Sequence, residues 1–283
     1  MTRSRSIPLG LLPAILLLGV LFAGGMSFAI LESLRPLFSF AHYRALLIEP
    51  ELRASILATF LVSTVATAIA TCLGLMLALA LRRFADGSRL LNTLLQFPIA
   101  IPHLAMAVLV LDVLSQSGLI SRILFFFHLI GQPSAFPEFL HDRYSIGIIL
   151  TYVLKETPFI ALVALATLGR SVTEYEWAAA TLGASRWQRF RHVTLPLIAP
   201  SVVSASLIVF AFIFGSFEIP FLLGKSYPPM LGVLVQRRYM SPQLDDRPDA
   251  IAAGILMSVV SALFVFAYLR LSVRLVGERP ALF

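Results

Sequence analysis

The sequence predicts an all-α integral membrane protein: one transmembrane domain over residues 1–283, with six membrane-spanning helices and a helix–turn–helix in one loop. Of its 283 residues, 58% are hydrophobic and 13% are charged, and the mean hydropathy is +0.88. A soluble domain carries about 25% charged residues and about 45–50% apolar ones. The basic residues recur in short clusters between long apolar runs. These observations exclude an ordinary soluble enzyme, a disordered tail and a secreted disulfide scaffold.

Six apolar runs are each about as long as the roughly 20 residues that cross a bilayer as a helix. The first follows Arg3 and Arg5, as the hydrophobic region of a signal peptide would, but residues 7–31 carry no charge. That length exceeds the about 7–15 residues of such a region, so we expect an uncleaved helix. The predicted spans are 7–30, 55–81, 92–115, 145–169, 197–223 and 249–269.

The basic clusters predict the orientation of these spans. If both termini are cytoplasmic, Lys and Arg are about twice as dense in the inner segments as in the outer ones. This is the direction of the positive-inside rule. We therefore expect residues 82–89 and 170–192 to be cytoplasmic and residues 224–248 to lie outside.

The second predicted span carries a hydroxyl side chain at every fourth position. Residues four apart lie on nearly the same face of a helix. Small hydroxylated residues let helices approach closely and bond across the contact. A helix-packing seam is the favoured interpretation and a wall of a polar pathway is the other. The residues are Ser55, Thr59, Ser63, Thr67 and Thr71.

Several ionisable residues fall inside or at the end of predicted spans. A charged group at the centre of a membrane helix costs at least about 2.5–3.5 kcal/mol, so each one needs water or a partner. Two interpretations are open: these residues line a transport pathway, or they make structural contacts between helices. Beside Glu218, Pro220 frees backbone groups in the same turn. The candidate pathway residues are Glu218, Glu156, Lys155 and Asp112, with Asp249 at a span end.

No catalytic residue and no metal-ligand set is identifiable. The run Gly224-Lys225-Ser226 resembles the end of a P-loop, but Ile219 stands where the loop needs its first glycine. The histidines are scattered and Cys72 is the single cysteine. The chain is not expected to be an enzyme or to hold a cofactor.

The loop between the fourth and fifth spans carries the most local signals. Thr173 with Glu176, and Ser185 with Gln188, each fit a capping box at the start of a helix. Gly183 stands where the first helix ends in a left-handed turn. The loop therefore predicts two short helices joined by a glycine turn.

The same loop offers a smooth surface for a partner protein. Residues 178–180 are alanines beside Trp177, which suits insertion into a groove. Pro196 ends the second helix or opens the next span. A DNA-binding helix–turn–helix is the rival interpretation, but this loop is tethered to the membrane at both ends, so no nucleic-acid partner is expected.

Residues 171–196 resemble the EAA loop of permease subunits of binding-protein-dependent ABC importers. That pattern is Glu-Ala-Ala, three residues, Gly, nine residues, then Ile-x-Leu-Pro. The matching positions here are Ala178, Ala179, Gly183, Val193, Leu195 and Pro196. Trp177 occupies the position of the glutamate, and Glu176 precedes it. Residues 216–224 and 247–250 look like the polyamine, iron and phosphonate branch of these permeases.

The resemblance implies a multi-pass permease in the bacterial inner membrane that works with partner chains. A second permease subunit, identical or homologous, would complete the pathway among the membrane lipids. Two cytoplasmic ATPase subunits would use ATP and Mg²⁺ and grip the loop at Trp177 and the matching positions. An external solute-binding protein would deliver the solute, whose identity the sequence leaves open. The alternative is a secondary transporter driven by an ion gradient through Asp112, Glu156 or Glu218.

Overall fold

The computed structural model describes residues 10, 12–35, 39–85, 89–243 and 246–276. Across these residues the chain is helical, and six helices are long and apolar enough to cross a membrane, which confirms the predicted fold class. The helices are α1 (Leu12–Ser33), α2 (Ala41–Ile48), α3 (Pro50–Ala85), α4 (Arg89–Ala100), α5 (His103–Leu114), α6 (Leu119–Phe126), η2 (Pro133–Ala135), α7 (Ile146–Thr167), α8 (Arg170–Thr181), α9 (Arg186–Arg189), η3 (Phe190–Thr194), α10 (Leu195–Gly215), α11 (Glu218–Leu223), α12 (Leu231–Tyr239) and α13 (Asp246–Val276).

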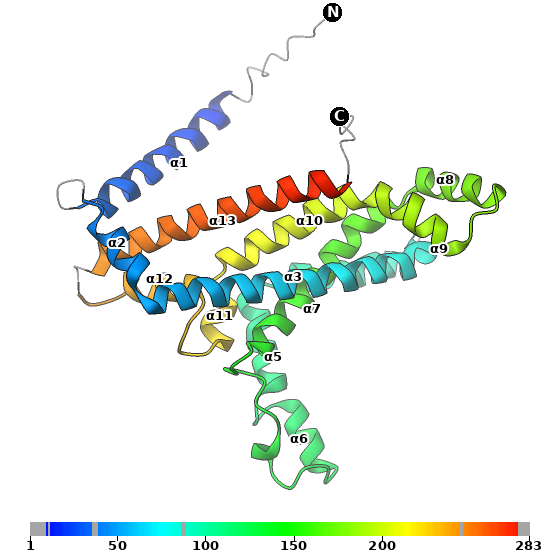
Figure 1. Ribbon diagram of the computed structural model, residues 1–283. Coiled ribbons are helices and arrows are strands. Elements are labelled where there is room, and N and C mark those ends of the chain that lie inside the picture. The colour runs from blue at the N-terminus through cyan, green and yellow to red at the C-terminus, as the bar shows by residue number, and fades with distance from the viewer. Residues whose placement is uncertain (1–9, 11, 36–38, 86–88, 244–245, 277–283) are drawn as a thin grey trace, which may run out of the picture.

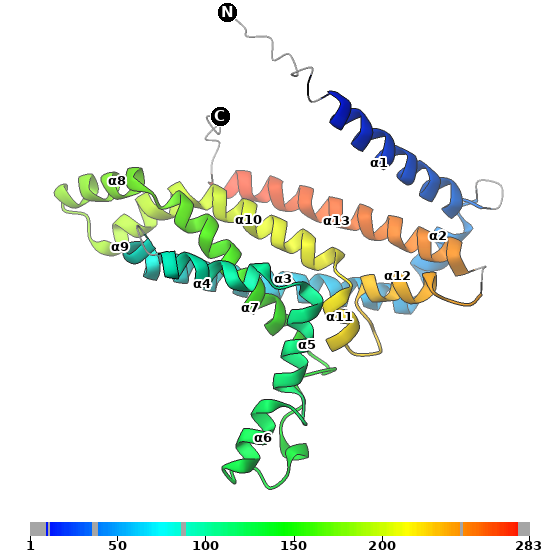
Figure 2. The same cartoon turned by 180° about the vertical axis from the view of Figure 1, so that it is seen from behind.

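Four long helices, α3, α7, α10 and α13, form the body of the molecule (Figure 1). Helix α1 touches α13 and leans away from it toward the N-terminus (Figures 1 and 2). Helices α5 and α6 project from the body as an arm. Helices α8 and α9 form one end of the body, and α2 and α12 lie at the other.

The hydroxyl stripe of α3 is a packing seam, as favoured from the sequence. Four of its five members are buried, and α3 makes its most extensive contact with α7. The helices approach closely at Gly74, where a Cβ would lie 2.9 Å from the Cβ of Ile160. Farther along the stripe, Thr59 accepts a hydrogen bond from the amide of Leu231 at 2.8 Å. Gly74 therefore permits the close approach of α3 and α7, and Thr59 joins α3 to the start of α12.

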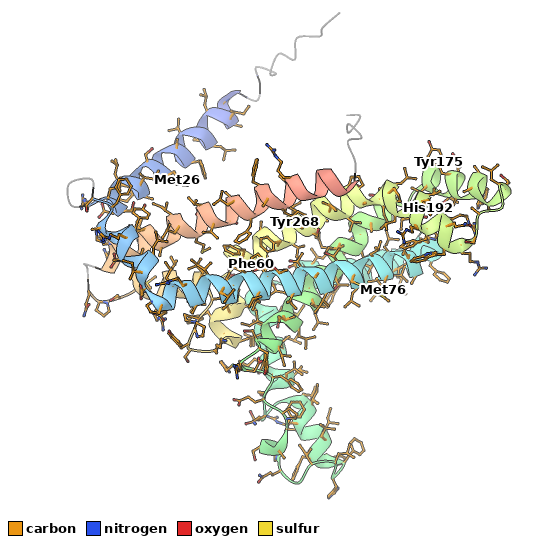
Figure 3. All side chains as sticks on the ribbon, in the orientation of Figure 1. Met26, Phe60, Met76, Tyr175, His192 and Tyr268 are labelled. Atoms are coloured by element: carbon orange, nitrogen blue, oxygen red, sulfur yellow. The ribbon has the colours of Figure 1, made fainter. Side chains whose placement is uncertain are left out.

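A cluster of phenylalanines joins α3, α10 and α13 on the other side of the body. Phe60 stacks on Phe264 with ring centroids 4.5 Å apart, and Phe210 and Phe214 pack around them. One helical turn beyond Phe264, Tyr268 of α13 shares a hydrogen bond of 2.6 Å with Ser206 of α10. Phe60 and Tyr268 are labelled in Figure 3.

Two predicted spans differ from the helices. The third, residues 92–115, is broken, because α4 ends at Ala100 and α5 begins at His103. The stretch here that is long and apolar enough to cross a membrane is His103–Phe126, over α5 and α6. The fifth, residues 197–223, includes a second break at residues 216–217, between α10 and α11. Hydropathy averages over a window, so it does not register a change of direction inside an apolar run. Arg3, Arg5 and the first residues of the span predicted at 7–30 lie outside the described residues. So do residues 86–88 of the predicted inner segment 82–89.

Candidate functional site

Gly183 makes the turn between α8 and α9. Its φ is +85°, which confirms the left-handed conformation predicted from the sequence. The amide of Gly183 donates to the carbonyl of Ala180, and that of Ala184 donates to the carbonyl of Ala179, each at 3.0 Å. This pair of bonds is the Schellman arrangement that closes a helix C-terminus. A residue with a Cβ is disfavoured at this φ by about 1–2 kcal/mol.

One of the two predicted capping boxes is present. Ser185 accepts a hydrogen bond from the amide of Gln188, and the Gln188 side chain accepts one from the amide of Ser185. The box predicted at Thr173 and Glu176 is wrong, because α8 begins at Arg170 after Gly169. Glu176 therefore lies inside α8, where its carboxylate bonds to other parts of the chain.

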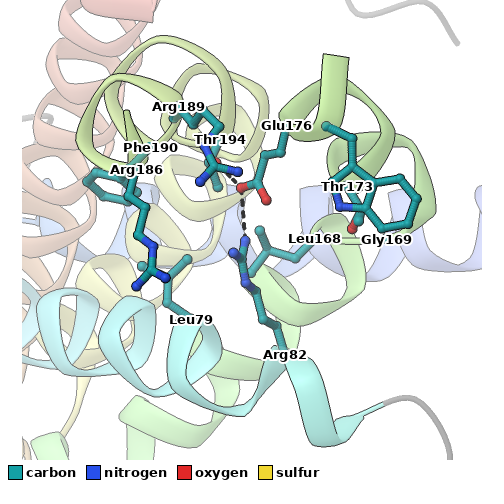
Figure 4. A pocket seen from close by; sticks show the side chains of 11 residues that line it. Leu79, Arg82, Leu168, Gly169, Thr173, Glu176, Arg186, Arg189, Phe190 and Thr194 are labelled. Carbon is teal, nitrogen blue, oxygen red and sulfur yellow. Dashed lines mark hydrogen bonds and ion pairs between the residues drawn. The ribbon is translucent and has the colours of Figure 1, made fainter. Parts of the chain in front are cut away.

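Glu176 ties α8 to two neighbouring elements. It is buried, and its carboxylate accepts a hydrogen bond from Arg82 at the end of α3 at 2.9 Å and another from Thr194 of η3 (Figure 4). Burial alone would raise the pKa of Glu176. The bonds from Arg82 and Thr194, with the charges of Arg82 and Arg189, outweigh it and hold the pKa below its usual value. The ionised carboxylate thus fastens three elements at this end of the molecule.

The second loop helix continues into the fifth span. Helix α9 passes through the π-helical turn η3 into α10, and the amide of Leu195 donates to the carbonyl of Phe190 across that turn. Pro196 lies in the first turn of α10, directly after the π-helical turn η3. Of the two roles predicted for Pro196, the structure shows the one that opens the span.

A hollow of about 780 Å³ lies between the end of α3, helix α8 and the α9–η3 segment. Arg82, Glu176 and Arg189 meet at one wall, and Arg186 reaches in from the α9 side (Figure 4). Its lining residues are Leu79, Arg82, Leu168, Gly169, Thr173, Glu176, Trp177, Arg186, Arg189, Phe190 and Thr194.

The structure distributes the predicted loop residues around this hollow and a smaller one. Trp177 is 68% exposed and lines the large hollow, whereas Ala178 is exposed and Ala179 is half-buried. Val193 and Pro196 line a second hollow of about 200 Å³. Leu195, between them, is half-buried.

The break between α4 and α5 is held by Lys155 of α7. The Lys155 side chain is buried, and its ammonium donates to three backbone carbonyls, of Pro98 at 3.1 Å, Ile99 at 3.3 Å and Ile101 at 2.5 Å. These carbonyls are at the C-terminal end of α4, where a cation is favoured by the helix dipole. Lys155 therefore holds the break together, and because it also lines a small cavity beside the break, its place in a pathway stays a prediction.

Glu156, the next residue, lies at the α5 side of the break. Its carboxylate lies 3.4 Å from the ring of His103, the first residue of α5. An acidic group is favoured at a helix N-terminus. Glu156 and His103 line a cavity of about 180 Å³ with Phe212, whose ring centroid is 4.4 Å from that of His103. The two neighbouring charges are therefore not a pair, and each complements one end of the break.

The other ionisable candidates do not line this cavity. Glu218 is exposed at the start of α11, and the helix break precedes it at residues 216–217. Pro220 occupies the first turn of α11 and so removes no helix bond. Asp112 is exposed on α5 and makes no ion pair or side-chain hydrogen bond to the described residues. Asp249 lies 2.5 Å from His42 of α2.

Sequence reasoning missed four residues of these sites. In the sequence, His103 is one of several scattered histidines, and Arg82, Arg186 and Arg189 indicate only the topology. Pro98 and Pro102, which flank the break in the third span, were the signal for His103. The sequence holds no comparable signal for the arginines, because folding alone brings α3 against the loop.

The comparisons with known proteins agree with this architecture. Residues 70–277 match the family described as the inner membrane component of binding-protein-dependent transport systems. The chain is 29% identical over 245 residues to the inner membrane ABC transporter permease protein YnjC of Escherichia coli K12, covering 85% of this chain and 45% of that longer protein. It is 26% identical over 231 residues to the sulfate transport system permease protein CysT of the same organism, covering 81% of this chain and 79% of CysT.

Among solved structures, the fold is similar to a chain of a bacterial alginate ABC transporter in complex with a periplasmic protein that holds an alginate pentasaccharide. The TM-score is 0.77 at 24% sequence identity, and the match covers 94% of this chain and 93% of that one. The family model alone covers more than half of the chain. The chain therefore belongs to the family of inner membrane components of binding-protein-dependent transport systems, and it is a permease subunit of an ABC importer.

Proposed function

We propose that the helix–turn–helix of residues 171–196 is the surface through which ATPase subunits drive this permease. The observation that carries the proposal is the turn at Gly183, which has a left-handed φ at the spacing of the EAA loop. ATP and Mg²⁺ would be used in the partner chains, and this chain would contribute no catalytic residue. Trp177, exposed where the pattern has glutamate, would meet the partner through an aromatic contact in place of a charged one.

The link from Glu176 to Arg82 and Thr194 supports this role. These bonds join α8 directly to α3 and to Thr194, the residue before α10. A movement of α8 would therefore be transmitted to both helices through side-chain contacts. Helix α10 in turn carries Phe212 at the cavity beside His103 and Glu156. We propose that this cavity borders the solute pathway, which a second permease subunit, identical or homologous, would complete.

The direction of transport and the orientation belong to the same proposal. With both termini cytoplasmic, α8 and α9 face the ATPases, and α2 and α12 face an external solute-binding protein. A periplasmic protein that holds an alginate pentasaccharide is present in the alginate transporter structure with the similar fold. The named relatives do not fix the solute of this chain, and the resemblance to the polyamine, iron and phosphonate branch stays a prediction.

Reconstitution tests the proposal. The chain would be placed in proteoliposomes with the permease, ATPase and binding protein encoded beside it, and uptake would be measured against a panel of candidate solutes. We expect uptake that requires ATP and the binding protein and that persists when ionophores collapse the ion gradients. Uptake that is independent of ATP and lost with the gradients would overturn the proposal in favour of a secondary transporter.

A further inference from the structure

The large hollow at the α8–α9 end carries unbalanced positive charge. Arg82, Arg186 and Arg189 line it with a single carboxylate, that of Glu176. Glu176 is already engaged by Arg82 and Thr194. Arg186 makes no ion pair or side-chain hydrogen bond to any residue that the structure describes. The hollow therefore holds guanidinium groups with donors to spare.

Arg189 provides a second, independent sign of a missing acceptor. Its Nε is buried and has no hydrogen-bond partner among the described residues. A buried donor without an acceptor is costly, and more so when it is charged, so such a group normally has a hydrogen-bond partner in the protein, in water or in a bound group. A guanidinium presents its donors in a fork that matches the oxygens of a phosphate or carboxylate. The ligand expected here is an oxyanion.

The position of the hollow indicates the source of that oxyanion. Arg82 is the last residue of one candidate membrane span, and Arg186 is the first residue of another. Both arginines thus lie at the ends of long apolar stretches, on the α8–α9 side of the molecule. Trp177 at the rim is a residue type enriched at membrane–water interfaces, while Leu79 and Leu168 give the hollow an apolar side. Basic pockets between membrane helices are known to bind lipid headgroups.

We propose that this hollow binds the phosphate headgroup of an anionic phospholipid. Its volume of about 780 Å³ accommodates a headgroup, whereas a lone carboxylate would leave most of it unfilled. Arg186 and Arg189 would hold the phosphate oxygens, and Arg82 would keep its bond to Glu176 while offering its remaining donors. The headgroup would then join α9 to the end of α3 beside the bonds that Glu176 already makes.

The test is a lipid titration followed by native mass spectrometry on the purified, delipidated full-length chain. Phosphatidylglycerol is the probe, and phosphatidylcholine, which has a phosphate but no net charge, is the comparison lipid. We expect preferential binding of phosphatidylglycerol. Each arginine near an anionic headgroup contributes about a fivefold gain in affinity, so Arg186→Gln should weaken binding about fivefold and Arg186→Gln with Arg189→Gln about 25-fold.

Arg191→Gln is the matched control, because Arg191 is exposed on the same segment and does not line the hollow. Arg186 is itself exposed, so its single variant keeps the test valid if the double variant folds poorly. Equal phosphatidylglycerol binding by the parent and Arg186→Gln, or equal losses in Arg186→Gln and Arg191→Gln, would overturn the proposal.

Two further arms distinguish other occupants. If inorganic phosphate binds the lipid-free chain with the same arginine dependence and displaces the lipid, the site takes free phosphate and the lipid proposal fails. If lipid binding disappears in the complex with the ATPase, and ATPase capture depends on Arg186, an acidic side chain of the partner occupies the hollow and the proposal also fails. Retention of phosphatidylglycerol in the complex supports it.

Discussion

Replacing Lys155 with methionine should destabilise the helix break on which the cavity is built. Methionine has a similar length and no donor, so the change removes three hydrogen bonds and leaves the carbonyls of Pro98, Ile99 and Ile101 unpaired. Lys155 is only 3% exposed, so its ammonium is largely shielded from water.

The size of the effect follows from two opposing contributions to the free energy of unfolding. A hydrogen bond to a charged group contributes about 1.5–3 kcal/mol, so three such bonds at about 2 kcal/mol each contribute about 6 kcal/mol. Removing a buried ammonium from the membrane relieves about 3 kcal/mol. The net loss of unfolding free energy is therefore about 3 kcal/mol, which corresponds to a fall in Tm of roughly 6–12 °C for a chain of this size.

The fall in Tm is measured by thermal unfolding of the purified parent and Lys155→Met in detergent, monitored by tryptophan fluorescence. Lys225→Met is the matched control, because that lysine donates to a single carbonyl, of Arg143, at an exposed site. We expect the control to unfold within about 1 °C of the parent, as most surface substitutions change stability by less than about 0.5 kcal/mol. A Lys155→Met protein as stable as the parent would refute the capping role of Lys155.

Three further substitutions test other parts of the structure. Gly183→Val should insert normally but capture less ATPase in co-purification, because valine opposes the left-handed turn; a parental yield would show that the turn is dispensable. Since the pKa of Glu176 is lowered, its ionised contacts stabilise the chain above about pH 4.5 and are lost as pH falls through the lowered value. Glu176→Gln should therefore show a shallower fall of Tm between pH 7 and pH 3, and an unchanged slope would contradict the link. Gly74→Leu should lower stability by about 1–3 kcal/mol through its clash with Ile160, whereas Gly254→Ala, which meets only an ordinary contact, should not; equal denaturation midpoints for the two would refute the close approach.

The features that could be predicted from the sequence are those that depend on near neighbours. The membrane class, the apolar runs and the turn at Gly183 follow from composition and local spacing, and so does the box of Ser185 and Gln188. These signals operate within a helix turn or over a single apolar run. Their physical causes are therefore present in a short stretch of sequence.

The features that could not be predicted depend on partners far along the chain. Glu176 fits a capping box on local grounds, but Arg82, 94 positions earlier, takes its carboxylate once α3 packs against the loop. The sequence offers Lys155 as a candidate pathway charge, and only the fold shows that its ammonium bonds to three carbonyls at the break, 54 to 57 positions before it. Local spacing carries no information on such pairs.

The most direct test of the central claim, that the helix–turn–helix is the ATPase contact, is site-specific photo-crosslinking. A photoreactive phenylalanine analogue would replace Ala178, which is exposed on α8, and, as a control, Leu57, which is exposed on the apolar surface of α3. The variants would be irradiated in membranes that contain the whole importer. The account predicts a covalent adduct with the ATPase from position 178 and none from position 57. No adduct from position 178, in a complex that still takes up solute, would contradict it.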